Sequence, residues 1–298
     1  MKLNEMRKFE NTLLEKLIEN LKKGGEHVSS YIKHYIEIVN NFYKYSHRNQ
    51  FLILSQYPEA EYVTSIQGWN KKKRYVKKGE HGIKIYSPVI KEKKIYHVRK
   101  FTEEQLLEFS GSPDMEFHDI EEEGINIDAM KSQGIDIDVD ESGDGRLKLV
   151  IEKKKEIAAM VPRTVFDIKQ TDGEPFEPTK PKKKSTSEKY IAVKKLCKQY
   201  NINTELTDNL KVLPLENKIN VFMKQIAERL LAKYSKSNEI NSLDVEVAKS
   251  LSLASIDVKT EDDMEAILTL WVSTSVTPVD SLVAINKSVA EIVKNVYN

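Results

Sequence analysis

Residues 69–89 constrain the fold more than any other stretch, because they combine alternating apolar and polar residues with turn-forming glycines. The alternation in residues 74–76 and 83–89 is typical of half-buried β-strands, and Gly79 and Gly82 bracket a turn between them. The sequence therefore predicts a sheet whose basic side chains gather on one face or at the tip of this turn.

Positive charge is concentrated in the same part of the chain, where residues 69–100 hold twelve Lys or Arg and two Glu. This density suits contact with a phosphate backbone and carries no base specificity of its own. Aromatic rings between the cations could stack on unpaired bases. The predicted phosphate contacts are Lys71, Lys72, Lys73, Arg74, Lys77, Lys78 and Lys84, with His81 in the same turn, and the predicted stacking residues are Tyr45, Trp69 and Tyr75. The alternative is that the rings belong to the core and the charges form a solvated face.

Helices are expected before this stretch, at residues 3–21, 30–42 and 46–57, because apolar residues recur there at three- and four-residue spacing. The third of these begins beside a polar, aromatic segment, and a helix N-terminus attracts anions. Tyr45, Ser46, Arg48 and Asn49 therefore extend the predicted basic surface. Alternatively, Ser46 and Asn49 only cap the helix and Tyr45 only packs.

The remaining composition is that of an ordinary globular protein, with 298 residues, enough for two domains. Cys197 is the single cysteine, so no internal disulfide is expected, and a reducing cytoplasm is the predicted location. No signal peptide and no apolar run of about 18 residues is recognisable, so no membrane partner is expected.

Five blocks of residues follow one another along the first 175 positions. They are Tyr45-Ser46-x-x-Asn49, Tyr62-Val63, the Trp69 to Gly82 stretch, Ile85 to Val89, and Val165-Phe-Asp-Ile-x-Gln-Thr-x-Gly-Glu-Pro175. In this order they resemble the N-terminal domain of the antirestriction protein ArdC and its relatives on mobile elements. The resemblance implies a small α+β domain that binds single-stranded DNA, carried by plasmids, integrative elements and phages. In that family it is often joined to a zinc metallopeptidase-like domain.

The second half of the chain is expected to be mostly helical, because five segments show helical periodicity with polar N-terminal caps. These segments are residues 187–200, 216–236, 242–256, 262–275 and 279–297. A proline-rich, basic stretch precedes them and predicts a linker at residues 176–187. The predicted fold class is therefore α+β, with an N-terminal domain at residues 1–175 and a helical domain at 188–298.

The resemblance would place an H-E-x-x-H zinc helix in the second domain. The best counterpart is residues 227–231, Ala-Glu-Arg-Leu-Leu, with Asp244 or Glu246 near the place of the third ligand, and both histidines are absent. All six histidines of the chain lie within the first 118 residues. We therefore expect no metal, no cofactor and no catalytic residue, with Glu228 as an ordinary surface residue.

An acidic insert at about residues 102–147 departs from the family pattern, with fifteen Asp or Glu and one Lys between Thr102 and Gly145. Asp138 and Asp140 begin a partial calcium-loop pattern, but Leu149 stands where the final Glu is needed, so calcium is not expected. Two short strands are expected, one with Ile125 and Ile127 and one at residues 135–139, with partial disorder as the alternative. Three roles remain open: folding over the basic face, imitating nucleic acid toward a partner, or keeping an insertion soluble.

These observations predict a non-enzymatic, single-stranded-DNA-binding accessory protein of a mobile element, with a degenerate metallopeptidase-like domain. The rival hypothesis is a protein-directed inhibitor of a host defence nuclease or regulator, which acts through the acidic insert and the helical domain.

Overall fold

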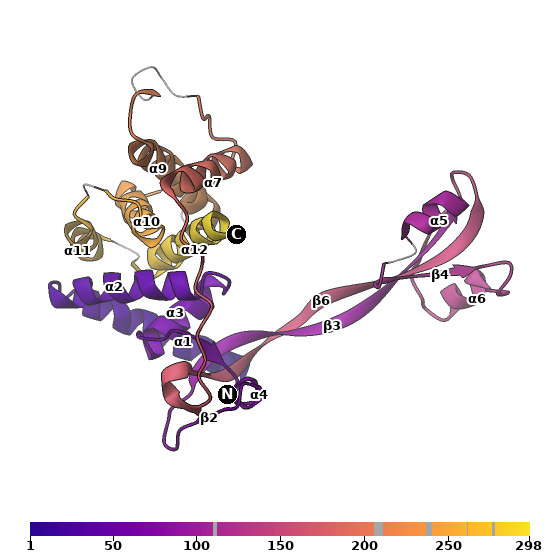
Figure 1. The fold of residues 1–298 in the computed structure, drawn as a ribbon, viewed down its shortest axis with the longest axis horizontal. Helices are drawn as coiled ribbons and strands as arrows, with labels where there is room; N and C mark the ends of the chain where they lie inside the picture. The colour runs from indigo at the N-terminus through magenta and orange to yellow at the C-terminus, as the bar shows by residue number, and fades with distance from the viewer. Residues whose placement is uncertain (110–111, 206–210, 237–239, 261, 276–277) are drawn as a thin grey trace. The chain divides into compact units, whose positions relative to one another are not determined.

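The chain divides into two units, and the sequence of the second is inserted into the sequence of the first (Figure 1). The computed structural model describes residues 1–298 except 110–111, 206–210, 237–239, 261 and 276–277. The first unit contains Met1–Tyr86 together with Pro162–Asn298, and the second contains Ser87–Val161. The predicted linker at residues 176–187 therefore lies inside the first unit, and the second unit is the insert with the strands that enter and leave it.

Three helices open the first unit: α1 (Leu3–Leu21), α2 (Glu26–Asn41) and α3 (His47–Gln56). Each buries an apolar stripe, as the spacing of its apolar residues predicted. Ser46 is the N-cap of α3, and its side chain accepts a hydrogen bond from the backbone N–H of Asn49. The three predicted helices are confirmed, with α2 beginning four residues earlier than expected.

Short elements follow and form the part of the first unit that carries the basic stretch. They are β1 (Val63–Thr64), α4 (Ile66–Lys71), β2 (Arg74–Val76), a 3-10 turn (Ile168–Gln170) and β7 (Thr171–Gly173). β2 pairs antiparallel with β7, and β1 pairs antiparallel with the end of β6 (Arg146–Asp167). The basic stretch is thus held by residues about a hundred positions later in the sequence. Strand β3 (Ile83–Phe101) is longer than predicted and pairs with β6.

The C-terminal helices are α7 (Thr186–Gln199), α9 (Leu215–Tyr234), α10 (Ser242–Ser255), α11 (Met264–Thr274) and α12 (Pro278–Tyr297). All five agree with the predicted segments. α10, α11 and α12 contact α2, and α12 also contacts α1 and α3. Buried residues of both groups of helices belong to one hydrophobic core. The mixed α+β first part and the mostly helical last part are therefore present, and they share a core within one unit.

The second unit contains α5 (Glu103–Phe109), β4 (Met115–Asp119), α6 (Ile127–Ser132) and β5 (Ile137–Asp140), together with the last part of β3 and the first part of β6. β5 runs parallel to β3, and β4 runs antiparallel to β6. Val98, Ile137 and Leu149 form its small core. The strand expected at Ile125 and Ile127 is wrong, because Asn126 accepts a hydrogen bond from the N–H of Ala129 (2.8 Å) and starts helix α6 instead.

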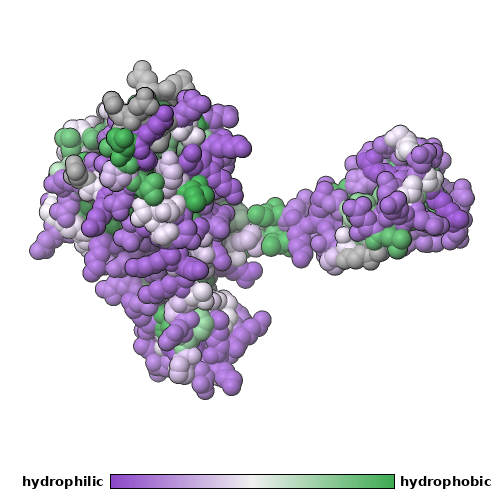
Figure 2. Space-filling model, turned by 45° about the horizontal axis from the view of Figure 1, so that its top comes forward, coloured by the Kyte–Doolittle hydropathy of each residue, from purple (hydrophilic) through white to green (hydrophobic). Residues whose placement is uncertain are grey.

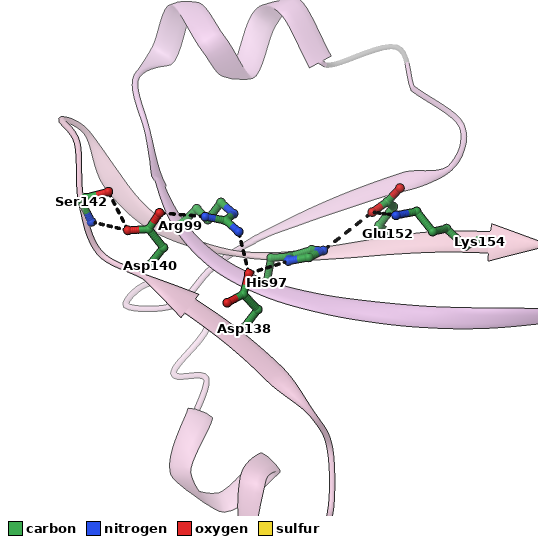
Figure 3. A network of polar contacts seen from close by, with 7 residues as sticks. All are labelled: His97, Arg99, Asp138, Asp140, Ser142, Glu152 and Lys154. Carbon is green, nitrogen blue, oxygen red and sulfur yellow. Dashed lines mark hydrogen bonds and ion pairs between the residues drawn. The ribbon is translucent and has the colours of Figure 1, made fainter. Parts of the chain in front are cut away.

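Acidic residues on β5 pair with cationic residues on β3 (Figure 3). The parallel register sets Asp138 opposite His97 and Asp140 opposite Arg99. Arg99 contacts both carboxylates, at 2.6 Å and 2.9 Å, while the ring of His97 lies 3.4 Å from Asp138 and 3.7 Å from Glu152. The two Asp residues that begin the partial calcium-loop pattern are therefore paired with Arg99.

Candidate nucleic-acid interface

Two buried polar side chains, Asp167 and Gln170, organise the backbone around the basic stretch. The Asp167 carboxylate is fully buried and accepts hydrogen bonds from the backbone N–H groups of Glu61 (2.8 Å), Tyr62 (2.9 Å) and Lys169 (2.9 Å). The Gln170 amide donates to Glu80 and to the carbonyl of His81, both at 2.9 Å. The turn at residues 77–82 is therefore fixed by the Phe-Asp-Ile-x-Gln block at the end of β6 and in the 3-10 turn after it.

Arg74 fastens β2 to β7. Its Nε donates to the Thr171 hydroxyl at 2.9 Å, and Nη2 donates to the Thr171 carbonyl at 2.8 Å. The third guanidinium nitrogen, Nη1, donates to the carbonyl of Glu174. With these donors occupied, Arg74 has a structural role, and its predicted phosphate contact would have to compete with backbone acceptors.

The other predicted cations divide into those whose side chains make polar or ring contacts with other described residues and those whose side chains do not, which we call unengaged. Lys77 donates to the Lys169 carbonyl at 2.8 Å, and Lys84 donates to the Thr164 hydroxyl at 2.6 Å. The ammonium of Lys72 lies 4.3 Å from the ring centroid of Phe176 and 5.6 Å from that of Tyr62. Lys71, Lys73 and Lys78 are exposed and make no side-chain hydrogen bond or ion pair with the described residues.

Two more predicted residues lie exposed beside the unengaged lysines. The Tyr75 side chain projects from β2 between two less exposed neighbours and is 62% exposed. The His81 ring is exposed at the end of the turn, with Nδ1 3.1 Å from the carbonyl of Gly79. Tyr75 therefore has an exposed ring, as base stacking requires, two positions after Lys73 and three before Lys78 in the sequence.

Trp69 requires a correction, because its side chain is fully buried. Its indole Nε1–H donates to the carbonyl of Phe166 at 2.8 Å, and its ring meets Tyr62 and Phe176 edge-on, at centroid distances of 5.5 Å and 5.7 Å. No face of the ring is open to a base. The alternative reading of Trp69 as a core residue is the one that fits.

The polar segment before α3 is also occupied by internal contacts. Asn49 is buried, and its side-chain amide exchanges two hydrogen bonds of 2.8 Å with the backbone of Tyr86. Arg48 forms a two-point ion pair with Glu10, and its guanidinium carbon lies 4.4 Å from the Tyr86 ring centroid. The partner Glu10, through this hydrogen bond, raises the pKa of Arg48. Arg48 thus ties α3 to α1, Asn49 ties it to β3, and Ser46 caps it, which leaves only part of Arg48 open to a ligand.

Tyr45 is half-buried and fixed at both ends. Its hydroxyl donates to the carbonyl of Val63 at 3.3 Å, and its ring meets Phe42 edge-on at 5.4 Å. Burial raises the pKa of Tyr45. One side of this residue borders a groove that also contains Tyr62, a residue to which the sequence pattern assigned no role. The position of Tyr62 before helix α4 is visible in the sequence, but the contacts of its ring with Trp69 and Phe176 depend on the tertiary fold.

The counterpart of the zinc helix lies on α9. Glu228 is exposed, whereas Asp244 accepts a hydrogen bond from the indole of Trp271 at 2.6 Å and Glu246 pairs with Lys224 and Lys249. In the part of the chain that the structure describes, no three His, Cys, Asp or Glu residues are grouped as metal ligands would be. Within that part, no helix is both long and apolar enough to cross a membrane.

Comparison with known proteins bears on this N-terminal part. Residues 7–131 match the family model described as the N-terminal domain of anti-restriction factor ArdC. The predicted ArdC resemblance is confirmed. The match includes α4, β2 and the basic turn, whereas the block at residues 165–175 lies outside it. A solved structure, described as the metal-free crystal structure of antirestriction ArdC protein from R388 plasmid, is similar at 10% identity over 85% of each chain, with a TM-score of 0.37. No curated protein matches the chain.

Proposed function

We propose that this chain is a non-catalytic accessory protein of antirestriction type, carried by a mobile element, that binds single-stranded DNA in the cytoplasm. The observation that carries the proposal is that the unengaged lysines Lys71, Lys73 and Lys78 are exposed and that Tyr75, which lies among them in the sequence, has an exposed ring. Cations without internal partners are free to replace the counterions of a phosphate backbone, and an exposed ring adds stacking that tolerates any base. The ArdC resemblance of the same residues points to the same ligand.

Hydrophilic residues cover most of the face seen in Figure 2. Lys71, Lys73 and Lys78 come from the end of α4 and from both sides of β2, so a strand of DNA would cross this short β-ribbon. Lys77 and Lys84 would add charge without leaving their carbonyl and hydroxyl partners, because an ammonium group has three donors.

The test is a titration of labelled single-stranded and double-stranded DNA at several salt concentrations, with a Lys71→Glu/Lys73→Glu/Lys78→Glu variant. We expect weaker binding to single strands and a salt slope smaller by about 2, since each lost phosphate contact removes about 0.7. The matched control changes three exposed lysines elsewhere in the first unit, Lys22, Lys195 and Lys198, to Glu. Equal losses in both variants would show that only net charge matters and would refute this site.

A second candidate function is inhibition of a host defence protein through the acidic insert. Its support is a set of carboxylates that are exposed and take part in no side-chain ion pair with the described residues. They are Glu103, Glu104, Glu108, Asp114, Glu121, Asp128, Asp136, Glu141 and Asp144. Deleting residues 103–144 separates the two candidates, because DNA affinity would persist while capture of a host nuclease would be lost.

A further inference from the structure

A groove lined by three tyrosines lies in the first unit, between the turn that follows α2 and the segment that leads to α7. Its volume is about 240 Å³, and Tyr43, Tyr45 and Tyr62 contribute its rings. Thr179 and Lys180 close one side of it. The groove is therefore assembled from three separate parts of the sequence, and the Lys-rich turn at residues 77–82 is not among them.

The rings of this groove are held in place before any ligand arrives. Tyr45 is fixed by its hydrogen bond to Val63 and by Phe42, as described above. Tyr62 is held edge-on by Trp69 at 5.5 Å and by Phe176 at 4.8 Å, and Tyr43 meets Tyr297 edge-on at 6.0 Å. Rings fixed in this way lose little conformational entropy when they stack on a ligand.

The charge around the groove is positive. Lys44 and Lys180 both line it and are exposed, and the ammonium of Lys44 lies 5.4 Å from the Tyr43 ring centroid. None of the described residues that line it is acidic. The larger pocket beside α1 and α12 differs in this respect, because Glu10 and Asp280 line it. Aromatic faces flanked only by cations suit a planar ring attached to phosphate.

The groove also connects to the unengaged lysines. Lys72 follows directly on α4 and lies over the Tyr62 ring, at 5.6 Å, while Lys71 and Lys73 on either side of it are exposed. A DNA backbone that contacts Lys71 or Lys73 thus meets a sequence neighbour of Lys72, the lysine that lies over the Tyr62 ring. This continuity favours a nucleotide of the bound strand over an unrelated small molecule.

We propose that this groove binds one base of the single strand, with stacking on Tyr62 or Tyr43 and with Lys44 and Lys180 on the flanking phosphates. The proposal rests on the function proposed above and adds to it the place where a base is held. Trp69 then acts as the buried support of Tyr62, which explains why an indole precedes the lysine run although it touches no base.

The experiment compares two oligonucleotide probes of equal length, one of thymidines and one of abasic sites, which carry the same phosphates. For the unmodified protein we expect tighter binding of the thymidine probe. Tyr43→Leu and Tyr62→Leu should each weaken thymidine binding by on the order of tenfold, leave abasic binding unchanged, and leave the salt slope unchanged. Tyr62→Phe keeps the ring and should retain affinity.

The matched control is Tyr190→Leu, since Tyr190 is a half-buried tyrosine on α7 with the ammonium of Lys194 5.9 Å from its ring centroid. It should leave both affinities unchanged. If Tyr62→Leu unfolds the chain, Tyr43→Leu and the pair Lys44→Glu/Lys180→Glu still decide the question. Equal affinity for both probes, unaffected by Tyr43→Leu, would overturn the groove proposal and leave DNA binding intact. Failure to bind either probe would instead overturn the proposed function itself.

Discussion

Replacing Trp69 by Phe tests whether this ring supports the fold or contacts DNA. The change removes the Nε1–H that donates to the Phe166 carbonyl, so a buried acceptor loses its partner. An unpaired buried group costs about 1–3 kcal/mol. Trp69→Ala also leaves the volume of a fully buried side chain empty, which raises the expected loss to about 3–5 kcal/mol. Since a domain is stable by only about 5–15 kcal/mol, both losses are measurable.

The assay is urea unfolding of the unmodified chain and of the Phe and Ala variants, followed by DNA titration under conditions in which each remains folded. We expect the unfolding midpoint to fall from the unmodified chain to Phe and then to Ala, with little change in DNA affinity for Phe. Trp69 and Trp271 are both fully buried, so an oligonucleotide should not quench the tryptophan emission. Quenching, together with a loss of affinity at an unchanged midpoint, would refute the assignment of Trp69 to the core.

Three further predictions concern the pH dependence of stability, the buried carboxylate of Asp167 and the zinc content of the protein. Burial, with Lys287 and Arg48 nearby, lowers the pKa of His47 to about 4, so below about pH 6.5 the unfolded chain binds a proton that the folded chain does not. The free energy of unfolding should therefore fall between pH 6.5 and 4, by up to about 3 kcal/mol, and His47→Gln should flatten this dependence in urea titrations at the two pH values. Asp167→Ala leaves three backbone N–H groups without their acceptor and should lower the unfolding midpoint markedly, whereas an unchanged midpoint would contradict its structural role. Elemental analysis of the purified protein should find far less than one zinc per chain and no peptidase activity, while about one zinc with an activity that Glu228→Gln abolishes would contradict the non-catalytic proposal.

The helices were predictable from the sequence because each buries a stripe whose period is set by the helix itself. The insert was harder to predict, since Ile125 and Ile127 fit an alternating strand as well as the start of a helix. The decisive signal was Asn126 as an N-cap, whose side chain bonds the N–H three residues later. A two-residue alternation is too short to outweigh such a cap.

The site was predictable as a concentration of charge but not as a set of free side chains. No feature of the neighbouring sequence distinguishes Arg74 from Lys73, yet the Arg74 guanidinium is hydrogen-bonded to Thr171, which lies 97 positions later in the sequence. The same holds for Trp69, whose partner is the Phe166 carbonyl. Which cations remain available is decided by long-range hydrogen bonds, and those depend on the completed fold.

The first unit is built from two stretches of the chain on either side of the second unit, and this has a consequence for synthesis on the ribosome. Helices α1 to α3 are made before the second unit, but the helices that cover α2 are α10 to α12, which are made after it. The insert has its own core from residues contiguous in the sequence and is complete long before them. The inner unit can therefore fold first, while the apolar side of α2 stays uncovered until α10 to α12 have been made. A chain that stops at residue 175 would keep that side exposed, so we expect it to aggregate or to recruit chaperones rather than to act as an independent DNA-binding domain.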